Sequence, residues 1–205
     1  MEITRELAKF NTIKFHDKEH KYYMNDTKMS SVTQLIGKYK QPFDSDYWSE
    51  KKAKERGILK EEILKEWKYK ADFSTQKGSA FHAFAENYLF NKVFPFPEEE
   101  MTEVLGGTEN MLECRAAVKT IIELFKKFYD DSYGKLIPVR AEVVVGDEEL
   151  GLCGMIDQLF WNEKSGKLEI WDWKTNKKID RKNKWQQFKD PISHLDVCEL
   201  NTYSL

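Results

Sequence analysis

Acidic residues occur within three strand-like segments in the second half of the chain. The segments cover residues 139–145, 152–161 and 167–174, and they carry Glu142, Asp157 and Asp172, respectively. Because a β-meander places successive strands side by side, we expect the Asp157 and Asp172 carboxylates to meet on one face, with Glu142 as a third acidic group. Close carboxylates repel each other, and a divalent cation relieves that repulsion. The pattern therefore predicts a metal site.

Lys174 follows Asp172 by two residues, so the alternation of a strand places both side chains on one face. An alternative interpretation is an ordinary ion pair between Asp172 and Lys174 on an edge strand, with Asp157 at a solvated strand end. That alternative is the more common explanation of an isolated Asp-x-Lys. A lone carboxylate in the apolar run CGMIDQLF is costly to bury, however, and three acidic positions on successive strands favour the metal site.

Three short motifs follow one another along the chain: Gly78-Ser-Ala-Phe-His82, GMID ending at Asp157, and DWKT at 172–175. Together they resemble the PD-(D/E)XK nuclease superfamily, specifically its RecB-type branch of phage and bacterial exonuclease-like proteins. The upstream segment YYMNDTKMSSVTQLI is similar to the hairpin and capped helix of phage-encoded members. The resemblance covers roughly residues 20–175 and implies a restriction-endonuclease-like core.

The resemblance also implies a role for each motif residue. The implied metal ligands are His82, Asp157, Asp172 and the backbone carbonyl of Trp173. Lys174 would position and activate the attacking water, and Glu142 would serve as an accessory acid that holds a second metal ion or a water. Oxygen ligands favour Mg²⁺ or Mn²⁺, with one or two ions bound, and the single histidine suits Mn²⁺. Glu86 is a candidate to orient His82, and a helix salt bridge is an equal alternative.

The function implied by the resemblance is a Mg²⁺- or Mn²⁺-dependent deoxyribonuclease that acts in DNA recombination, repair or processing. The preference for an exonuclease rests on the resemblance alone. The implied partners are single-stranded DNA or duplex ends, together with recombination or replication proteins, in the cytoplasm of a bacterial or phage-infected cell. The alternative is a catalytically inactive nuclease-fold module that binds DNA or protein. An unrelated phosphohydrolase lacks support, because the chain has no glycine-rich phosphate loop.

A basic segment follows the third strand. Residues 174–189 carry seven basic side chains against Asp180 alone. The residues predicted to bind DNA are Lys177, Lys178, Arg181, Lys182, Lys184 and Trp185. Trp185 and Phe188 are candidates to stack on unpaired bases. The lysines of 51–70 alternate with glutamates, so we interpret that segment first as a solvated helix face and second as a DNA clamp.

The elements that position these residues can be read from the periodicity of the sequence. Two short strands are predicted within 13–29, around a turn at 16–20 and with a second turn at 25–26, and Ser30 or Ser31 caps a short helix. Helical patterns cover 47–70, 76–91 and 109–130, and the acidic stretch 98–109 is predicted to be a loop. We expect an α/β (α+β) fold with a central mixed sheet covered by the helices at 76–91 and 109–130.

The predicted organisation is an N-terminal hairpin and helical region over residues 1–75, followed by a nuclease core over 76–205, in one compact unit. RecB-type proteins continue after the third strand with a helix that carries Gln-x-x-x-Tyr. Here Glu199 lies four residues before Tyr203, so we expect the chain to stop at the start of that helix.

Composition limits the remaining classes of protein. The chain has 205 residues, 40% of them hydrophobic, which excludes wholesale disorder, and no apolar run approaches the ~20 residues of a membrane span. The charged N-terminus is not typical of a secretory signal, so no membrane partner is expected. Cys114, Cys153 and Cys198 indicate reduced thiols and no iron–sulfur cluster. The net charge of −2 conceals a separation of acidic residues at 98–113 from the basic segment.

Overall fold

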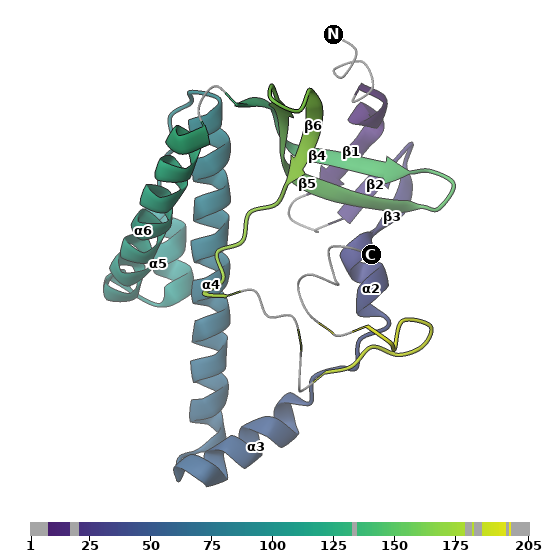
Figure 1. Cartoon of the computed structure of the whole chain (residues 1–205). Helices are drawn as coiled ribbons and strands as arrows, with labels where there is room; N and C mark the ends of the chain where they lie inside the picture. Colours follow the sequence, from purple (N-terminus) through teal and green to yellow (C-terminus); the bar gives the residue numbers. More distant parts are fainter. Residues whose placement is uncertain are drawn as a thin grey trace. The chain divides into compact units, whose positions relative to one another are not determined.

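The computed structural model describes residues 8–16, 21–132, 135–178, 182, 186–195 and 197. The chain divides into two compact units that are interleaved along the sequence. Figure 1 labels their helices and strands. Unit 1 comprises Met1–Phe43, Arg140–Leu159 and Asn176–Leu205, and unit 2 comprises Asp44–Val139 and Phe160–Thr175. The boundary predicted at residue 75 falls inside a helix of unit 2.

Three short antiparallel strands form the N-terminal part of unit 1. They are β1 (Ile13–His16), β2 (Lys21–Met24) and β3 (Thr27–Ser31), preceded by the 3-10 helix η1 (Lys9–Thr12). The predicted turn at 25–26 is confirmed: Asn25 and Asp26 have φ values of 47° and 63°, the left-handed conformation that a two-residue hairpin turn requires. A third strand was not predicted, and it forms because this tight turn brings residues 27–31 beside β2.

One face of this three-stranded layer is apolar. Ile13, Tyr22 and Met29 are buried together with Cys153, while residues between them in sequence face away, as strand alternation requires. Ser31 then caps α2 (Val32–Gly37) with a capping box, in which its side chain accepts from the Gln34 amide at 3.1 Å. The predicted cap is therefore confirmed.

The strands form a mixed sheet. Its order is β1-β2-β3-β5-β4, with β6 paired to β5, and the pairing of β3 with β5 is parallel. The strands β4 (Leu136–Asp147) and β5 (Leu152–Asn162) confirm the first two segments predicted to carry acidic residues. The strand β6 (Lys167–Trp171) ends earlier than predicted, so Asp172 and Lys174 lie in the segment after it.

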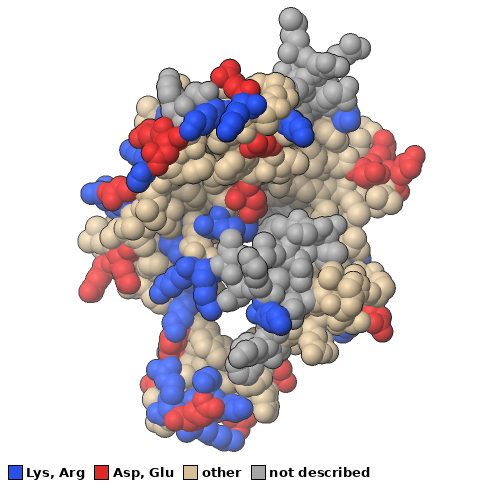
Figure 2. Space-filling model, in the orientation of Figure 1, with Lys and Arg blue, Asp and Glu red and all other residues tan. Residues whose placement is uncertain are grey.

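Unit 2 is built mainly from helices, beginning with α3 and α4. α3 (Ser45–Arg56) ends at Gly57, and α4 (Lys60–Leu89) follows as one continuous helix rather than two. The predicted break before residue 76 is wrong because residues 71–75 contain neither proline nor glycine. Basic and acidic side chains intermingle at the lower end of Figure 2, where α3 lies in Figure 1.

The acidic stretch predicted to be a loop contains a helix. α5 (Glu98–Leu105) follows Pro97, and three glutamates in its first turn interact favourably with the positive end of the helix dipole. Met101 and Leu105, four residues apart, are both buried, and Gly106 ends the helix with a φ of 75°. The prediction was wrong because the low hydrophobicity of the stretch concealed this short apolar face.

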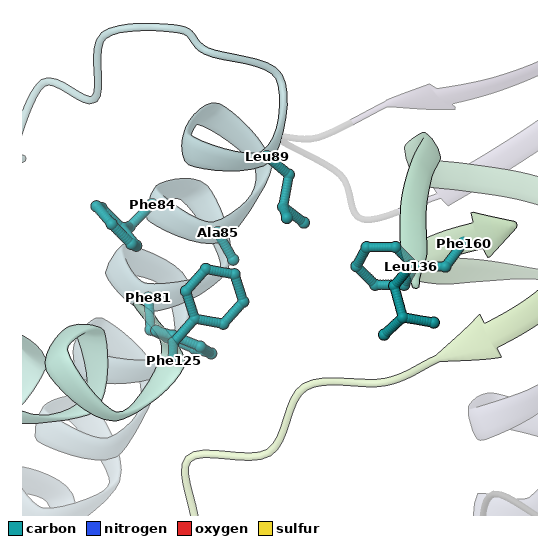
Figure 3. Packing of buried hydrophobic residues seen from close by; sticks show 7 residues of the cluster. All are labelled: Phe81, Phe84, Ala85, Leu89, Phe125, Leu136 and Phe160. Atoms are coloured by element: carbon teal, nitrogen blue, oxygen red, sulfur yellow. The ribbon is translucent and has the colours of Figure 1, made fainter. Parts of the chain in front are cut away.

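The hydrophobic core of unit 2 joins the helices to the strands. α6 (Thr108–Ser132) confirms the amphipathic helix predicted at 109–130. Its Phe125 packs in a cluster with α4 residues and with side chains from β4 and β5 (Figure 3). The cluster comprises Phe81, Phe84, Ala85, Leu89, Phe125, Leu136 and Phe160. Within unit 2, the predicted packing of these two helices on strand residues is therefore confirmed.

Within the part of the chain that the structure describes, none of the helices has the length and apolar character needed to span a membrane.

Candidate metal centre

The helix α4 contacts the segment that follows β6 through the residues of the Gly-x-x-x-His motif. The His82 Nε2 atom lies 3.2 Å from the carbonyl oxygen of Trp173. One helical turn earlier, Gly78 faces Thr175, and a Cβ atom at Gly78 would lie 3.8 Å from Thr175 Oγ1. The motif at 78–82 and the DWKT motif, far apart in the sequence, are thus in contact within unit 2.

A second polar contact, which the sequence did not predict, joins the same two segments. The Lys77 ammonium donates a hydrogen bond to the carbonyl oxygen of Thr175 at 3.0 Å. The only signal for Lys77 in the sequence was a basic side chain next to the motif glycine. Together, Lys77 and His82 contact the carbonyl groups of Thr175 and Trp173 and hold this segment against the helix.

The Trp173 indole anchors this segment from the other side. Its ring lies between 5.3 and 6.5 Å, centroid to centroid, from five aromatic rings of the core, mostly in edge-to-face arrangements. These rings belong to Phe81, Phe125, Phe128, Phe160 and Trp171. Edge-to-face pairs are the favoured geometry for aromatic side chains. The aromatic core therefore sets the position of the Trp173 backbone, and with it the carbonyl that faces His82.

Asp172 and Lys174 flank Trp173 and form an ion pair. The Lys174 ammonium lies 2.5 Å from Asp172 Oδ2 and also donates to the Trp173 carbonyl at 3.4 Å. The Lys174 side chain is 23% exposed, and the Asp172 side chain is 42% exposed. The ion pair that the alternative interpretation expected is therefore present, and it lies beside the carbonyl that contacts His82.

In unit 1, the other two predicted acidic residues lie on paired strands. Glu142 of β4 and Asp157 of β5 are both half-buried, and a carboxylate oxygen of one lies within 4.8 Å of a carboxylate oxygen of the other. Glu142 has a φ of 48°, a left-handed conformation that is uncommon for a residue other than glycine, asparagine or aspartate. Both predicted strand acids of this unit are therefore brought together.

Glu142 lies near the apolar cluster that contains Tyr22 and Cys153. Burial raises the pKa of the Tyr22 hydroxyl, and the charges of Cys153 and Glu142 raise it further. Burial also raises the pKa of the Cys153 thiol to about 11. The Glu142 carboxylate therefore lies close enough to the Tyr22 hydroxyl to affect its titration.

The spacing of both pairs of polar groups can be compared with that of the ligands of a divalent cation. Two neighbouring ligands of an octahedral Mg²⁺ or Mn²⁺ site lie about 3 Å apart, given metal–oxygen distances of about 2.1 Å. The His82–Trp173 separation matches this value, and the separation of Glu142 and Asp157 is compatible with it. Carboxylate, carbonyl and imidazole groups are also the ligand types that Mn²⁺ accepts. These residues could therefore hold such an ion, although the 3.2 Å His82–Trp173 contact is also a hydrogen-bond distance.

The predicted DNA-binding segment is described only in part. Lys177, Lys178 and Lys182 are exposed, whereas Arg181, Lys184 and Trp185 lie outside the described residues. Phe188 is 3% exposed and packs with Ile36 and Val197, so the prediction that it stacks on bases is wrong.

The lysines of α3 and the first half of α4 are largely engaged in ion pairs. These pairs are Lys52–Glu55, Lys54–Glu50, Arg56–Glu66, Lys60–Asp46, Lys68–Asp72 and Lys70–Glu66. The pairing agrees with the first interpretation of this segment as a solvated helix face. Because their charges are locally neutralised, these helices are poor candidates for a phosphate-binding surface.

Comparison of the chain with protein-family models, with curated proteins and with solved structures gives no match.

Proposed function

We propose that the protein is a metal-dependent nuclease that hydrolyses phosphodiester bonds of DNA. The observation that carries the proposal is the contact between the Gly78–His82 motif and the segment from Trp173 to Thr175. The two motifs that resemble a nuclease family meet through His82 and the Trp173 carbonyl. These two residues lie 91 positions apart in the sequence, and each is a candidate metal ligand. If the similarity of these short motifs were a coincidence, there would be no reason to expect this contact.

In the proposed site, Mg²⁺ or Mn²⁺ is held by His82, the Trp173 carbonyl, Asp157 and Asp172, with Glu142 as an accessory acid. When bound, such an ion lowers the pKa of a coordinated water and offsets negative charge on the phosphate.

The chain's own residues contribute orientation and positive charge. Asp172 holds the Lys174 ammonium in place through the 2.5 Å ion pair. Because Lys174 is still 23% exposed, it remains accessible to a phosphate oxygen or to a water molecule. A preorganised cation beside a scissile phosphate stabilises the charge that develops during hydrolysis. His82 and the aromatic packing of Trp173 fix the backbone between these two residues.

The decisive assay measures degradation of end-labelled single-stranded and duplex DNA in Mg²⁺, in Mn²⁺ and in EDTA. We expect Asp172→Asn and Lys174→Ala each to lower the rate about a hundredfold or more. The matched controls come from an exposed ion pair on α6, Lys127–Asp131, with an N–O distance of 2.9 Å. Asp131→Asn and Lys127→Ala should leave the rate unchanged.

Equal degradation by the wild type and by the Asp172 and Lys174 variants would refute the assignment. Failure of the wild type to degrade DNA in either metal, combined with DNA binding, would instead support an inactive nuclease-fold module. Calorimetric titration of Mn²⁺ provides a readout that does not depend on hydrolysis. Asp157→Asn and His82→Ala should each weaken Mn²⁺ binding at least tenfold, whereas His16→Ala should not.

A further inference from the structure

The outer face of the β1–β3 layer carries basic and aromatic side chains in a regular arrangement. The strand register places Lys14 opposite Tyr23, and Tyr23 opposite Lys28, so these three side chains form one row across the layer. His16 lies one position further along the same face, and its ring meets the Tyr23 ring edge-to-face at 5.0 Å. We call Lys14, His16, Tyr23 and Lys28 the outer hairpin face.

This face is hollowed rather than flat. An open groove of about 600 Å³ is lined by Thr12, Lys14, His16, Tyr23, Asn25 and Asp26. The volume lies in the range of cavities that accommodate organic ligands. The opposite side of the same strands is the apolar cluster around Tyr22 and Met29, so the layer is held in place without using the residues of the groove.

The charge of the outer hairpin face differs from that of the other lysine-rich surface. Neither Lys14 nor Lys28 forms an ion pair with any residue that the structure describes, whereas most basic residues of α3 and early α4 are paired. Among the described residues of β1, β2, β3 and the 25–26 turn, Asp26 supplies the one carboxylate. Outside these strands, the Glu148 carboxylate accepts a hydrogen bond from Asn25, a groove residue, at 3.4 Å. The two lysines, which have no ion pair with the described residues, carry the positive charge that an anionic partner would contact.

We propose that the outer hairpin face binds a segment of single-stranded nucleic acid. One base stacks on the Tyr23 ring, and Lys14 and Lys28 contact phosphates on either side of it. The backbones of Lys14 and Lys28 are two strand spacings apart, which is about 10 Å. The lysine side chains are flexible enough to reach from there to the two phosphates that flank one base. An aromatic platform between cations is the usual arrangement for binding single strands without sequence preference.

This inference deepens the proposed function by assigning a second contact surface for the nucleic acid, and it involves no metal ion. Binding is therefore measured in EDTA, by fluorescence anisotropy of labelled oligo-dT, with oligo-rU and duplex DNA as competitors. Because metal is absent, the result does not depend on whether the protein hydrolyses DNA.

The lysine contribution is tested with Lys14→Ala/Lys28→Ala. Each phosphate contact on a single strand contributes about 0.7 to the slope of log affinity against log salt concentration. We expect the double variant to reduce that slope by about 1.4 and the affinity about 25-fold at 0.1 M salt. The control Lys164→Ala/Lys167→Ala removes two exposed lysines from the turn before β6 and from its start, and it should leave both values unchanged.

The stacking contribution is tested with Tyr23→Leu and Tyr23→Phe. The leucine variant should lose about fivefold or more in affinity, whereas the phenylalanine variant keeps a ring and should bind like the wild type. Circular dichroism confirms that each variant is folded.

An unchanged salt slope in the double-lysine variant, an equal loss in the lysine control, or absence of oligo-dT binding by the wild type would overturn the inference. Binding of oligo-dT in EDTA without hydrolysis in Mg²⁺ or Mn²⁺ would refute only the nuclease.

Discussion

Replacement of Trp173 by alanine tests whether the aromatic core positions the candidate site. The ring is half-buried and lies at favourable distances from five aromatic rings, with Phe125 nearest at 5.3 Å. Removal of a buried tryptophan usually costs 3–5 kcal/mol of unfolding free energy. Because Trp173 is only partly buried, we expect about 3 kcal/mol, at the lower end of that range.

The expected change in melting temperature follows from the size of the chain. At about 2.1 cal/mol/K per residue, the unfolding entropy of 205 residues is about 0.43 kcal/mol/K, so the loss corresponds to a decrease of about 7 °C. Thermal unfolding followed by circular dichroism measures it. The rate of DNA degradation in Mn²⁺ should fall as well, because the Trp173 carbonyl is no longer held beside His82.

Two further tryptophan variants separate anchoring from general loss of an aromatic ring. Trp173→Phe keeps an aromatic ring in the cluster and should lower the melting temperature by less than half as much. Trp48 lies on α3, outside the aromatic cluster around Trp173, and contacts Tyr47 and Lys51, so Trp48→Ala should cost less than Trp173→Ala. A Trp173→Ala protein that melts within 1 °C of the wild type would refute the anchoring role. Equal losses at Trp173 and Trp48 would do the same.

Two further predictions concern stability. Gly78→Ala should raise the unfolding free energy by about 1 kcal/mol with nuclease activity retained, because the added Cβ makes ordinary contact with Thr175 and alanine favours the helix interior. Gly106→Ala should instead lower the unfolding free energy, because Gly106 has a φ of 75°. A lower melting temperature for Gly78→Ala would contradict the observed spacing between Gly78 and Thr175. Burial raises the pKa of Cys153 from about 9 to about 11, so the folded protein retains this proton while the unfolded chain loses it, and thermal stability should fall between pH 9 and 11. Cys153→Ala should reduce that fall, and an identical pH dependence in both proteins would show that another group causes it.

The sequence correctly predicted those elements in which the local residue pattern indicates a single kind of secondary structure. β4, β5 and α6 have a consistent period of apolar residues, and the turn at 25–26 and the Ser31 cap carry residues suited to their backbone conformations. The error at Phe188 arose because distant contacts decide the outcome there. Burial of Phe188 depends on Ile36 and Val197, which no local pattern connects to it.

The candidate site was predictable to the extent that it depends on motif residues. The contact of His82 with Trp173 and the proximity of Glu142 to Asp157 join residues that the sequence had singled out. The hydrogen bond of Lys77 and the early end of β6 were not predictable, because both depend on how α4 packs against the segment after the strand.

The backbone conformation of Glu142 has a cost in stability that bears on whether its carboxylate is needed. A left-handed φ costs a residue with a side chain about 1–2 kcal/mol relative to the usual conformations, and glycine would avoid that cost. Evolution or engineering for heat resistance alone would therefore favour glycine at this position, at the expense of an acidic group. Persistence of glutamate here through rounds of selection for thermostability would show that the carboxylate is required, and its rapid replacement would show that it is dispensable.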